Sequence, residues 1–162
     1  MLGAILKSMK NSDVLKKEYI CIDVDLSSKE EVLMFICNLA KSMNVILDSK
    51  VFYQSVLERE KMSATGLMNG IAIPHGISET VKEASVFYVR LKKPIKWESM
   101  DGSDIKHVFL LTIPKDTKDN IHLKMLSQLA RSLMDINIVK NLDLASNPSG
   151  ILNILRKGEE MQ

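Results

Sequence analysis

The chain contains little cysteine, and the two cysteines it has are far apart. Cys21 and Cys37 each lie in an otherwise apolar stretch, and no C-x-x-C spacing is present. Isolated cysteines of this kind are typical of reduced core residues in a cytoplasmic protein. The sequence therefore argues against a disulfide framework and against a cysteine-based metal site, and we expect a cytoplasmic location.

The chain also lacks an excess of charge of one sign and a long apolar run. Its net charge is +2, from 22 lysines and arginines against 20 acidic residues. This balance does not give the broad positive field of a general nucleic-acid binder, so an acidic protein partner is expected rather than nucleic acid. The apolar residues 1–6 are far fewer than the ~20 that a membrane span needs. We expect neither export nor membrane insertion.

A length of 162 residues is enough for one core and too short for two ordinary domains. We expect one domain over 1–162, without repeats or linkers. Hydrophobic periodicity predicts strands at 19–24, 84–91 and 105–113, and helices at 27–43, from 48 to about 59, at 119–133 and from 148. The helix at 27–43 is expected to begin with a capping box, Ser27-x-x-Glu30. Strands interleaved with helices predict an α/β three-layer sandwich, with a mixed central sheet of about five strands flanked by helices on both faces.

The segment around one histidine carries the strongest functional signal. It consists of Asn69-Gly70-Ile71-Ala72-Ile73-Pro74-His75-Gly76. Proline fixes φ and glycine permits unusual dihedrals, so the backbone aims the imidazole, and we interpret His75 as an exposed nucleophile. Backbone N–H groups in such a segment can form an anion-binding concavity. The residues that we expect to form it are Thr65, Gly66, Asn69, Gly70 and Gly76.

The longer segment 59–76 resembles a family pattern, R-E-x-x-x-S-T-G-x-G-N-G-I-A-I-P-H-G. Segments 89–97, 101–102, 108–111 and 122–124 follow it in the same order and spacing. From about Leu15 to about Arg156 the chain is similar to the IIA domains of the bacterial phosphotransferase system, fructose/mannitol type, which include nitrogen-regulatory IIA proteins. Ala64 replaces a usual serine, and Met68 replaces a usual glycine. If that glycine has positive φ, methionine there predicts strain or a different course of the loop.

The resemblance implies that His75 accepts a phosphoryl group on Nε2, with Arg59 and His122 beside it. An imidazole has a reference pKa near 6.5, so at neutral pH one ring nitrogen can attack phosphorus. The guanidinium of Arg59 suits phosphate oxygens, and His122 lies near the predicted start of a helix. The implied donor is HPr or its nitrogen-branch counterpart, and the implied acceptor is a cysteine of a IIB domain linked to a membrane IIC permease. No metal, nucleotide or other cofactor is implied.

Two other functions are compatible with the same residues. In the first, phosphorylation of His75 changes the docking of a regulatory module to a transporter, a kinase or a transcription factor. In the second, the chain's three histidines form a metal site, although they lack a close-spaced ligand pair and a carboxylate partner. We favour the phosphocarrier of sugar or polyol uptake. We assign no chemistry to His107.

Overall fold

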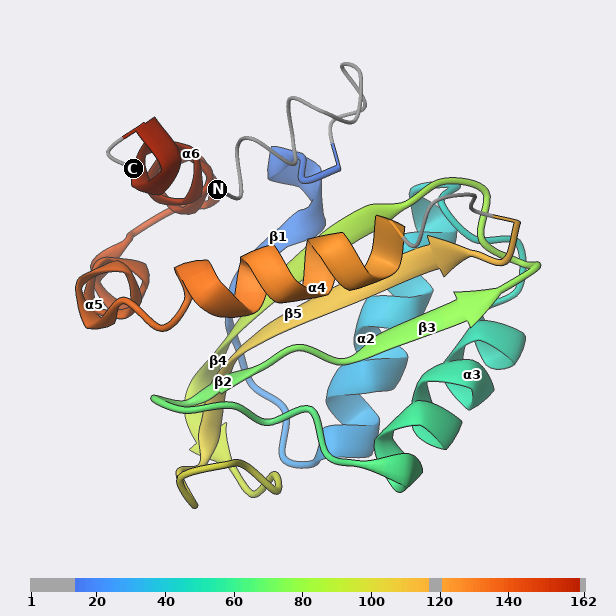
Figure 1. Ribbon diagram of the computed structural model, residues 1–162, viewed down its shortest axis with the longest axis horizontal. Coiled ribbons are helices and arrows are strands. Elements are labelled where there is room, and N and C mark those ends of the chain that lie inside the picture. Colours follow the sequence, from blue (N-terminus) through green and yellow to red (C-terminus); the bar gives the residue numbers. More distant parts are fainter. Residues whose placement is uncertain (1–13, 117–120, 161–162) are drawn as a thin grey trace.

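The computed structural model describes residues 14–116 and 121–160, and it arranges them as a sheet with helices on both faces (Figure 1). The strands are β1 (Ile20–Val24), β2 (Ile71–Ala72), β3 (His75–Ser78), β4 (Ser85–Ile95) and β5 (Ile105–Pro114). The helices are the 3₁₀ turn η1 (Lys17–Tyr19), α2 (Lys29–Ser42), α3 (Ser49–Met62), α4 (Ile121–Ser132), α5 (Ile136–Leu144) and α6 (Pro148–Glu160). No helix in these ranges is both long enough and apolar enough to span a membrane.

The sheet is mixed, as predicted. Strand β4 pairs in parallel with β1 and antiparallel with β5, and β5 pairs in parallel with both β2 and β3. Strands β2 and β3 follow one another along the same edge of β5, with Ile73 and Pro74 between them. Proline is tolerated there because an edge strand has backbone groups that pair with no further strand. The register of β3 places His75 opposite Leu111.

Side chains that point alternately to the two faces of the central strands form two hydrophobic cores, one on each face of the sheet. Phe87 and Val89 of β4 pack with α2 and α3, whereas Val86 and Tyr88 pack on the opposite face with α4, α5 and α6. Successive side chains of a strand point to opposite faces, so one strand supplies both clusters. The predicted α/β three-layer sandwich with five strands is confirmed.

The ends of the helices confirm some sequence predictions and correct others. The side chain of Asp48 caps α3 as expected, accepting from the backbone N–H groups of Lys50 and Val51. The cap of α2 is one residue later than predicted: Ser28 accepts from the N–H of Glu31. Strand β4 continues through Pro94 to Ile95, beyond its predicted end. The 3₁₀ turn, the two short edge strands and α5 were not predicted.

Helix α5 is held by a buried polar network. Nη1 of Arg90 donates to the carbonyls of Leu142 at 2.9 Å and Ala145 at 2.6 Å, at the end of the helix. The imidazole of His107 lies between the Tyr88 hydroxyl, 2.7 Å from Nδ1, and an Asp143 carboxylate oxygen, 2.8 Å from Nε2. Tertiary partners that are distant in sequence therefore stabilise this nine-residue helix, which local pattern alone does not predict.

The network predicts a loss of stability in acid. Burial lowers the pKa of His107, an effect that the carboxylate of Asp143 opposes and that Lys106 and Arg90 reinforce. The unfolded chain then binds the His107 proton first, as the pH falls through about 6.5. We expect the free energy of unfolding to fall as the pH drops below that value, and to fall less steeply in His107→Gln. Urea unfolding at several pH values would show this, and equal slopes in both proteins would contradict it.

Candidate functional site

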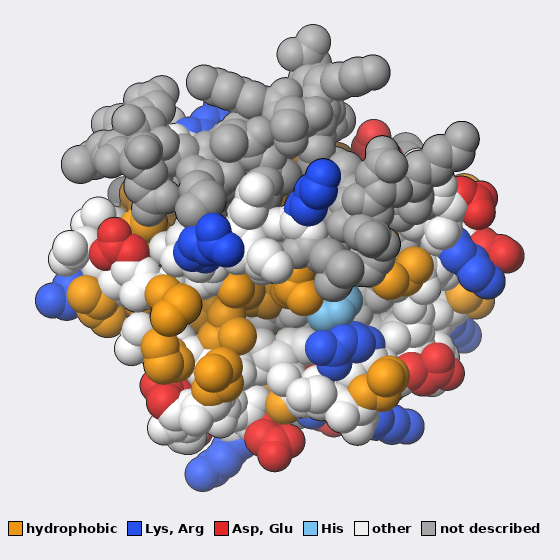
Figure 2. Space-filling model, in the orientation of Figure 1, with side chains coloured by type: hydrophobic (Ala, Val, Ile, Leu, Met, Phe, Trp, Pro, Cys, Tyr) orange, Lys and Arg blue, Asp and Glu red, His pale blue; other side chains and the backbone are white. Residues whose placement is uncertain are grey.

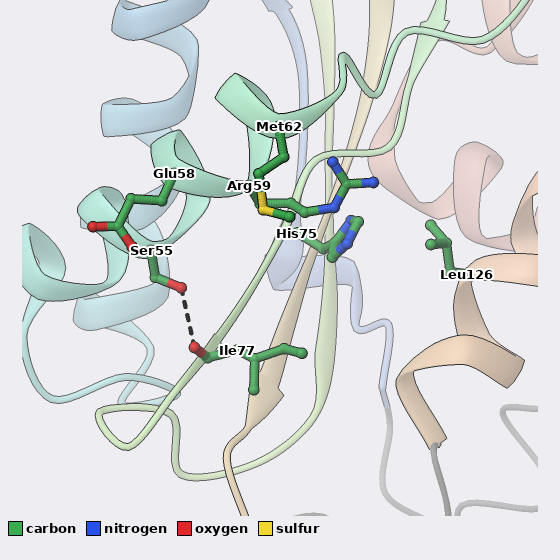
Figure 3. A pocket seen from close by; sticks show the side chains of 7 residues that line it. All are labelled: Ser55, Glu58, Arg59, Met62, His75, Ile77 and Leu126. Atoms are coloured by element: carbon green, nitrogen blue, oxygen red, sulfur yellow. Dashed lines mark hydrogen bonds between the residues drawn. The ribbon is translucent and has the colours of Figure 1, made fainter.

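A pocket of about 410 Å³ lies at the sheet edge, between α3 and α4 (Figure 3). Helix α3 packs against β3, and α4 contributes the opposite wall. The described residues that line the pocket are Ser55, Glu58, Arg59, Met62, His75, Ile77 and Leu126. The pocket thus joins an imidazole, a guanidinium and apolar side chains from segments that are far apart in the sequence.

His75 is the first residue of β3, and its ring forms part of the pocket floor. The residue is 8% exposed, so it is more enclosed than the exposed nucleophile that the sequence predicted. Its Nδ1 lies 3.3 Å from the backbone carbonyl oxygen of Ile73. A proton on Nδ1 donated to that carbonyl places the imidazole lone pair on Nε2. The Ile73 carbonyl, on the far side of Pro74, therefore favours a ring orientation and a tautomer in which Nδ1 carries the proton.

Gly76 allows α3 to approach β3 closely. A Cβ atom at this position would lie 2.9 Å from side-chain atoms of Phe52, Ser55 and Val56. On the same side, the Ser55 hydroxyl donates to the carbonyl of Ile77 at 3.1 Å. These contacts hold the helix against the strand that begins at His75. The glycine beside the histidine is thus required for packing, independently of any contact with a ligand.

Arg59 enters the pocket from the last turn of α3. Its guanidinium points towards the ring of His75, and the exposed side chain of Met62 lies near Arg59 in the same pocket (Figure 3). Nη1 donates to the backbone carbonyl of Ser63 at 2.7 Å, which leaves the other guanidinium donors for additional acceptors. The structure therefore brings Arg59 and His75 together. Figure 2 shows, on this face, a histidine beside a basic side chain and between apolar side chains.

His122 is the second residue of α4, but its side chain lies outside the part of the chain whose side chains are described. Leu126, four residues later in the same helix, lines the pocket. The placement of α4 is therefore established at this site. The role predicted for His122 stays a prediction.

The residues predicted to cradle a phosphate lie mostly elsewhere. Segment 65–73 is a hairpin in which the backbone N–H of Gly70 donates to the Ser103 hydroxyl at 3.2 Å and that of Asn69 to the Asp101 carboxylate at 3.1 Å. Hydrogen bonds from Ser103 and from the Asn69 N–H lower the pKa of Asp101 to about 2. Thr65, Gly66, Asn69 and Gly70 are not among the described residues that line the His75 pocket. Their described donors are occupied by Glu60, Asp101 and Ser103, which hold the hairpin against its neighbours.

The strain expected at Met68 is absent. The non-glycine residues with positive φ in the described ranges are Asp23, Asn44 and Asn69. Asn69 (φ 59°) and Gly70 (φ 78°) occupy the centre of the turn, and the N–H of Ile71 donates to the carbonyl of Met68 at 3.3 Å. This is the pattern of a type I′ turn, which requires positive φ only at its two central residues. Met68 precedes them.

Met68→Gly is consequently expected to destabilise the protein. Glycine would add freedom to the unfolded chain without relieving strain, which costs about 0.4–1 kcal/mol of unfolding free energy. Urea denaturation of the variant and the wild type would measure the difference. An unchanged or increased stability would show that methionine is strained at this position.

In the described part of the chain, no group of three or more histidine, cysteine or acidic side chains lies close enough to hold a metal ion. What the site presents is an oriented imidazole with a guanidinium beside it, at the edge of a mixed sheet. Residues 13–158 match the family model for the phosphoenolpyruvate-dependent sugar phosphotransferase system, EIIA 2, and the chain belongs to this family. Phosphoryl transfer is the general activity of the family, and the predicted resemblance is confirmed.

The chain resembles some known proteins over nearly their whole length, and it resembles others over only one part of a larger protein. A nitrogen regulatory protein of Klebsiella oxytoca is 34% identical over 149 residues, covering 91% of this chain and 91% of that protein. The Escherichia coli 2-O-alpha-mannosyl-D-glycerate-specific EIIABC component is 28% identical over 148 residues, covering 91% of this chain but only 22% of that protein. The crystal structure of the nitrogen regulatory protein IIA-Ntr from Neisseria meningitidis superposes with a TM-score of 0.83 at 28% identity, covering 88% and 97% of the two chains.

Proposed function

We propose that His75 is the phosphoryl acceptor of a phosphocarrier in the phosphotransferase system. The observation that carries this proposal is the pair formed by His75 and Arg59 in one pocket, with Nδ1 of the histidine held against the Ile73 carbonyl. This geometry supports Nε2 as the attacking atom in the proposal. The apolar side chains of Met62, Ile77 and Leu126 also line the pocket, and we propose that they contact the protein that carries the donor phosphoryl group.

In the proposed reaction, Nε2 of His75 attacks the phosphorus of a donor phosphohistidine. The new P–Nε2 bond forms as the donor's P–N bond breaks, and the donor imidazole leaves with the electron pair of that bond. Charge spreads over the three equatorial oxygens, so positioning and cationic donors contribute most of the catalysis. Arg59 supplies these donors from one side. His122 is the second proposed contributor, from the first turn of α4.

The proposed donor is an HPr-type phosphocarrier protein, and the proposed acceptor is a cysteine of a IIB domain during uptake of a sugar or polyol. A cysteine thiolate attacks the phosphorus of phosphorylated His75 and regenerates the imidazole. Support comes from the E. coli relative, whose name places EIIA, EIIB and EIIC functions in one protein. The functional link to a membrane IIC permease is part of the same proposal.

A regulatory role is the second candidate, and one observation favours it. The nitrogen regulatory relative matches over 91% of its own length, so the similarity covers nearly all of that protein. In this role the phosphoryl group on His75 alters docking to a transporter, a kinase or a transcription regulator. The added charge at the pocket would provide the switch.

Reconstitution separates the two candidates. The purified chain would be phosphorylated by labelled HPr or its nitrogen-branch counterpart, and candidate IIB domains would then be added. Transfer of the label to a IIB cysteine supports the uptake role. Stable retention of the label with every IIB domain, together with phosphorylation-dependent binding to a regulatory protein, would support the second candidate against the first.

A further inference from the structure

Glu60 is a buried carboxylate immediately after Arg59, in the last turn of α3. The residue is 6% exposed, and its Oε2 lies 4.0 Å from Nζ of Lys29. Thr65 holds it more directly: the hydroxyl donates to Oε1, and the backbone N–H donates to Oε2 at 3.4 Å. A buried carboxylate needs such donors because desolvation would otherwise be costly. The hydrogen bonds between Glu60 and Thr65 tie the end of α3 to the first residue of the hairpin.

The hydrogen bonds between Glu60 and Thr65 restrict the backbone carbonyl of Ser63, which accepts from Arg59. Ser63 lies between Glu60 and Thr65, and its N–H donates to the Arg59 carbonyl at 3.5 Å. The Ser63 carbonyl in turn accepts from Nη1 of Arg59 at 2.7 Å. Because the segment is tied at the helix end and again at Thr65, its backbone has little freedom to turn this carbonyl away. The guanidinium is thereby held on the pocket side of α3, where Figure 3 shows it.

Thr65 also connects to the other half of the site. Its carbonyl accepts from the N–H of Ile73 at 3.0 Å, and the carbonyl of Ile73 lies 3.3 Å from Nδ1 of His75. One residue therefore joins the segment that anchors Arg59 to the segment that orients His75. The Thr65 hydroxyl itself is buried against Glu60, and Thr65 is not among the described residues that line the pocket.

We propose that Glu60 and Thr65 are positioning residues that set the Arg59 guanidinium against the His75 ring. The inference rests on the proposed function, because it assigns the pair's contribution to phosphoryl transfer at His75. It gives Thr65 a role through Arg59 in place of direct contact with the phosphate. Glu60 and Thr65 then position Arg59 together, through the backbone of Ser63 that lies between them.

The test is the rate of phosphoryl transfer from phosphorylated HPr in Thr65→Val, which removes the hydroxyl and nearly keeps the shape. A misplaced catalytic group can cost up to about 100-fold, so we expect transfer to slow by about 10- to 100-fold. Thr65→Ser should recover most of the rate, because it restores the donor to Glu60. In the Arg59→Ala background, Thr65→Val should slow transfer no further, since both changes remove one interaction.

Thr80→Val is the matched control. Its hydroxyl, also on a buried threonine, accepts from the N–H groups of Leu47 and Asp48 at the opposite end of α3. We expect this variant to lose stability while transferring phosphate at the wild-type rate. Thermal melts would establish that every variant is folded at the assay temperature. If Thr65→Val does not fold, Glu60→Gln replaces it, because an amide keeps the volume but loses one of the two acceptor oxygens.

A second readout needs no phosphoryl donor. Side-chain ¹⁵N NMR would follow the Arg59 guanidinium, whose Nη resonances should show restricted rotation in the wild type and averaging in Thr65→Val. Wild-type rates in Thr65→Val, or losses that multiply in the double variant, would overturn the inference, as would unchanged Arg59 resonances. Failure of the wild type to accept phosphate would instead refute the proposed function, and the NMR result would still decide whether the pair positions Arg59.

Discussion

His75→Ala is expected to abolish phosphoryl labelling of the chain. The variant removes the proposed nucleophile, and neither Arg59 nor His122 is assigned to replace it. The fold should survive, because the ring contributes to a pocket floor and the packing of α3 on β3 depends on Gly76 and Ser55. Incubation with phosphorylated HPr, followed by intact-mass measurement, would show the result, and a thermal melt would confirm that the variant is folded.

His107→Gln is the matched control for this experiment. His107 is also buried, at 1% exposure, but its ring nitrogens contact Tyr88 of β4 and Asp143 of α5. The His107→Gln protein should accept one phosphoryl group as the wild type does, and its stability should depend differently on pH. Persistent labelling of His75→Ala would overturn the assignment of the acceptor.

Arg59→Ala is expected to leave the phosphorylation site intact and to slow transfer severely. Loss of one positioned donor to a developing charge typically costs on the order of 10²–10³ in rate. Arg59→Lys should recover part of that loss, because a lysine keeps the charge but lacks the planar fork of donors. Rapid-quench kinetics with phosphorylated HPr would measure both variants.

Lys61→Ala tests whether the effect of Arg59 comes from general positive charge. Lys61 lies two residues further along the same helix and lines a neighbouring hollow with Ser63 and Met100, outside the His75 pocket. We expect it to change the rate little, because exposed charges are screened by salt. Equal losses in Lys61→Ala and Arg59→Ala would remove Arg59 from the mechanism and leave only a surface field.

Much of the fold follows from patterns that the sequence displays locally. The helical periodicity of α2 and the Asp48 cap of α3 are local signals, and the apolar runs of β4 and β5 reflect their burial on both faces. Helix α5 could not be found in the same way, because its end is held by Arg90 from β4. Strands β2 and β3 are short, and their pairing with β5 depends on a chain segment more than 25 residues away.

The site was predicted in part. The sequence motif singled out His75 and Arg59, and the structure brings them into one pocket. The hairpin residues had suggested a phosphate cradle because glycines permit backbone donors to converge. In the structure Asn69 and Gly70 provide a type I′ turn instead, and their N–H groups bond to Asp101 and Ser103. These partners follow over 30 residues later, so no local pattern indicated that the donors were already occupied.

Mapping the phosphoryl group on the wild-type chain tests the central claim most directly. The chain would be incubated with phosphorylated HPr, and with its nitrogen-branch counterpart, then analysed by intact mass and by peptide mapping under alkaline conditions. We predict one phosphoryl group on His75, in an acid-labile and base-stable linkage to Nε2. Label on a serine, on Cys21 or on Cys37, or no label with any cognate donor, would contradict the account.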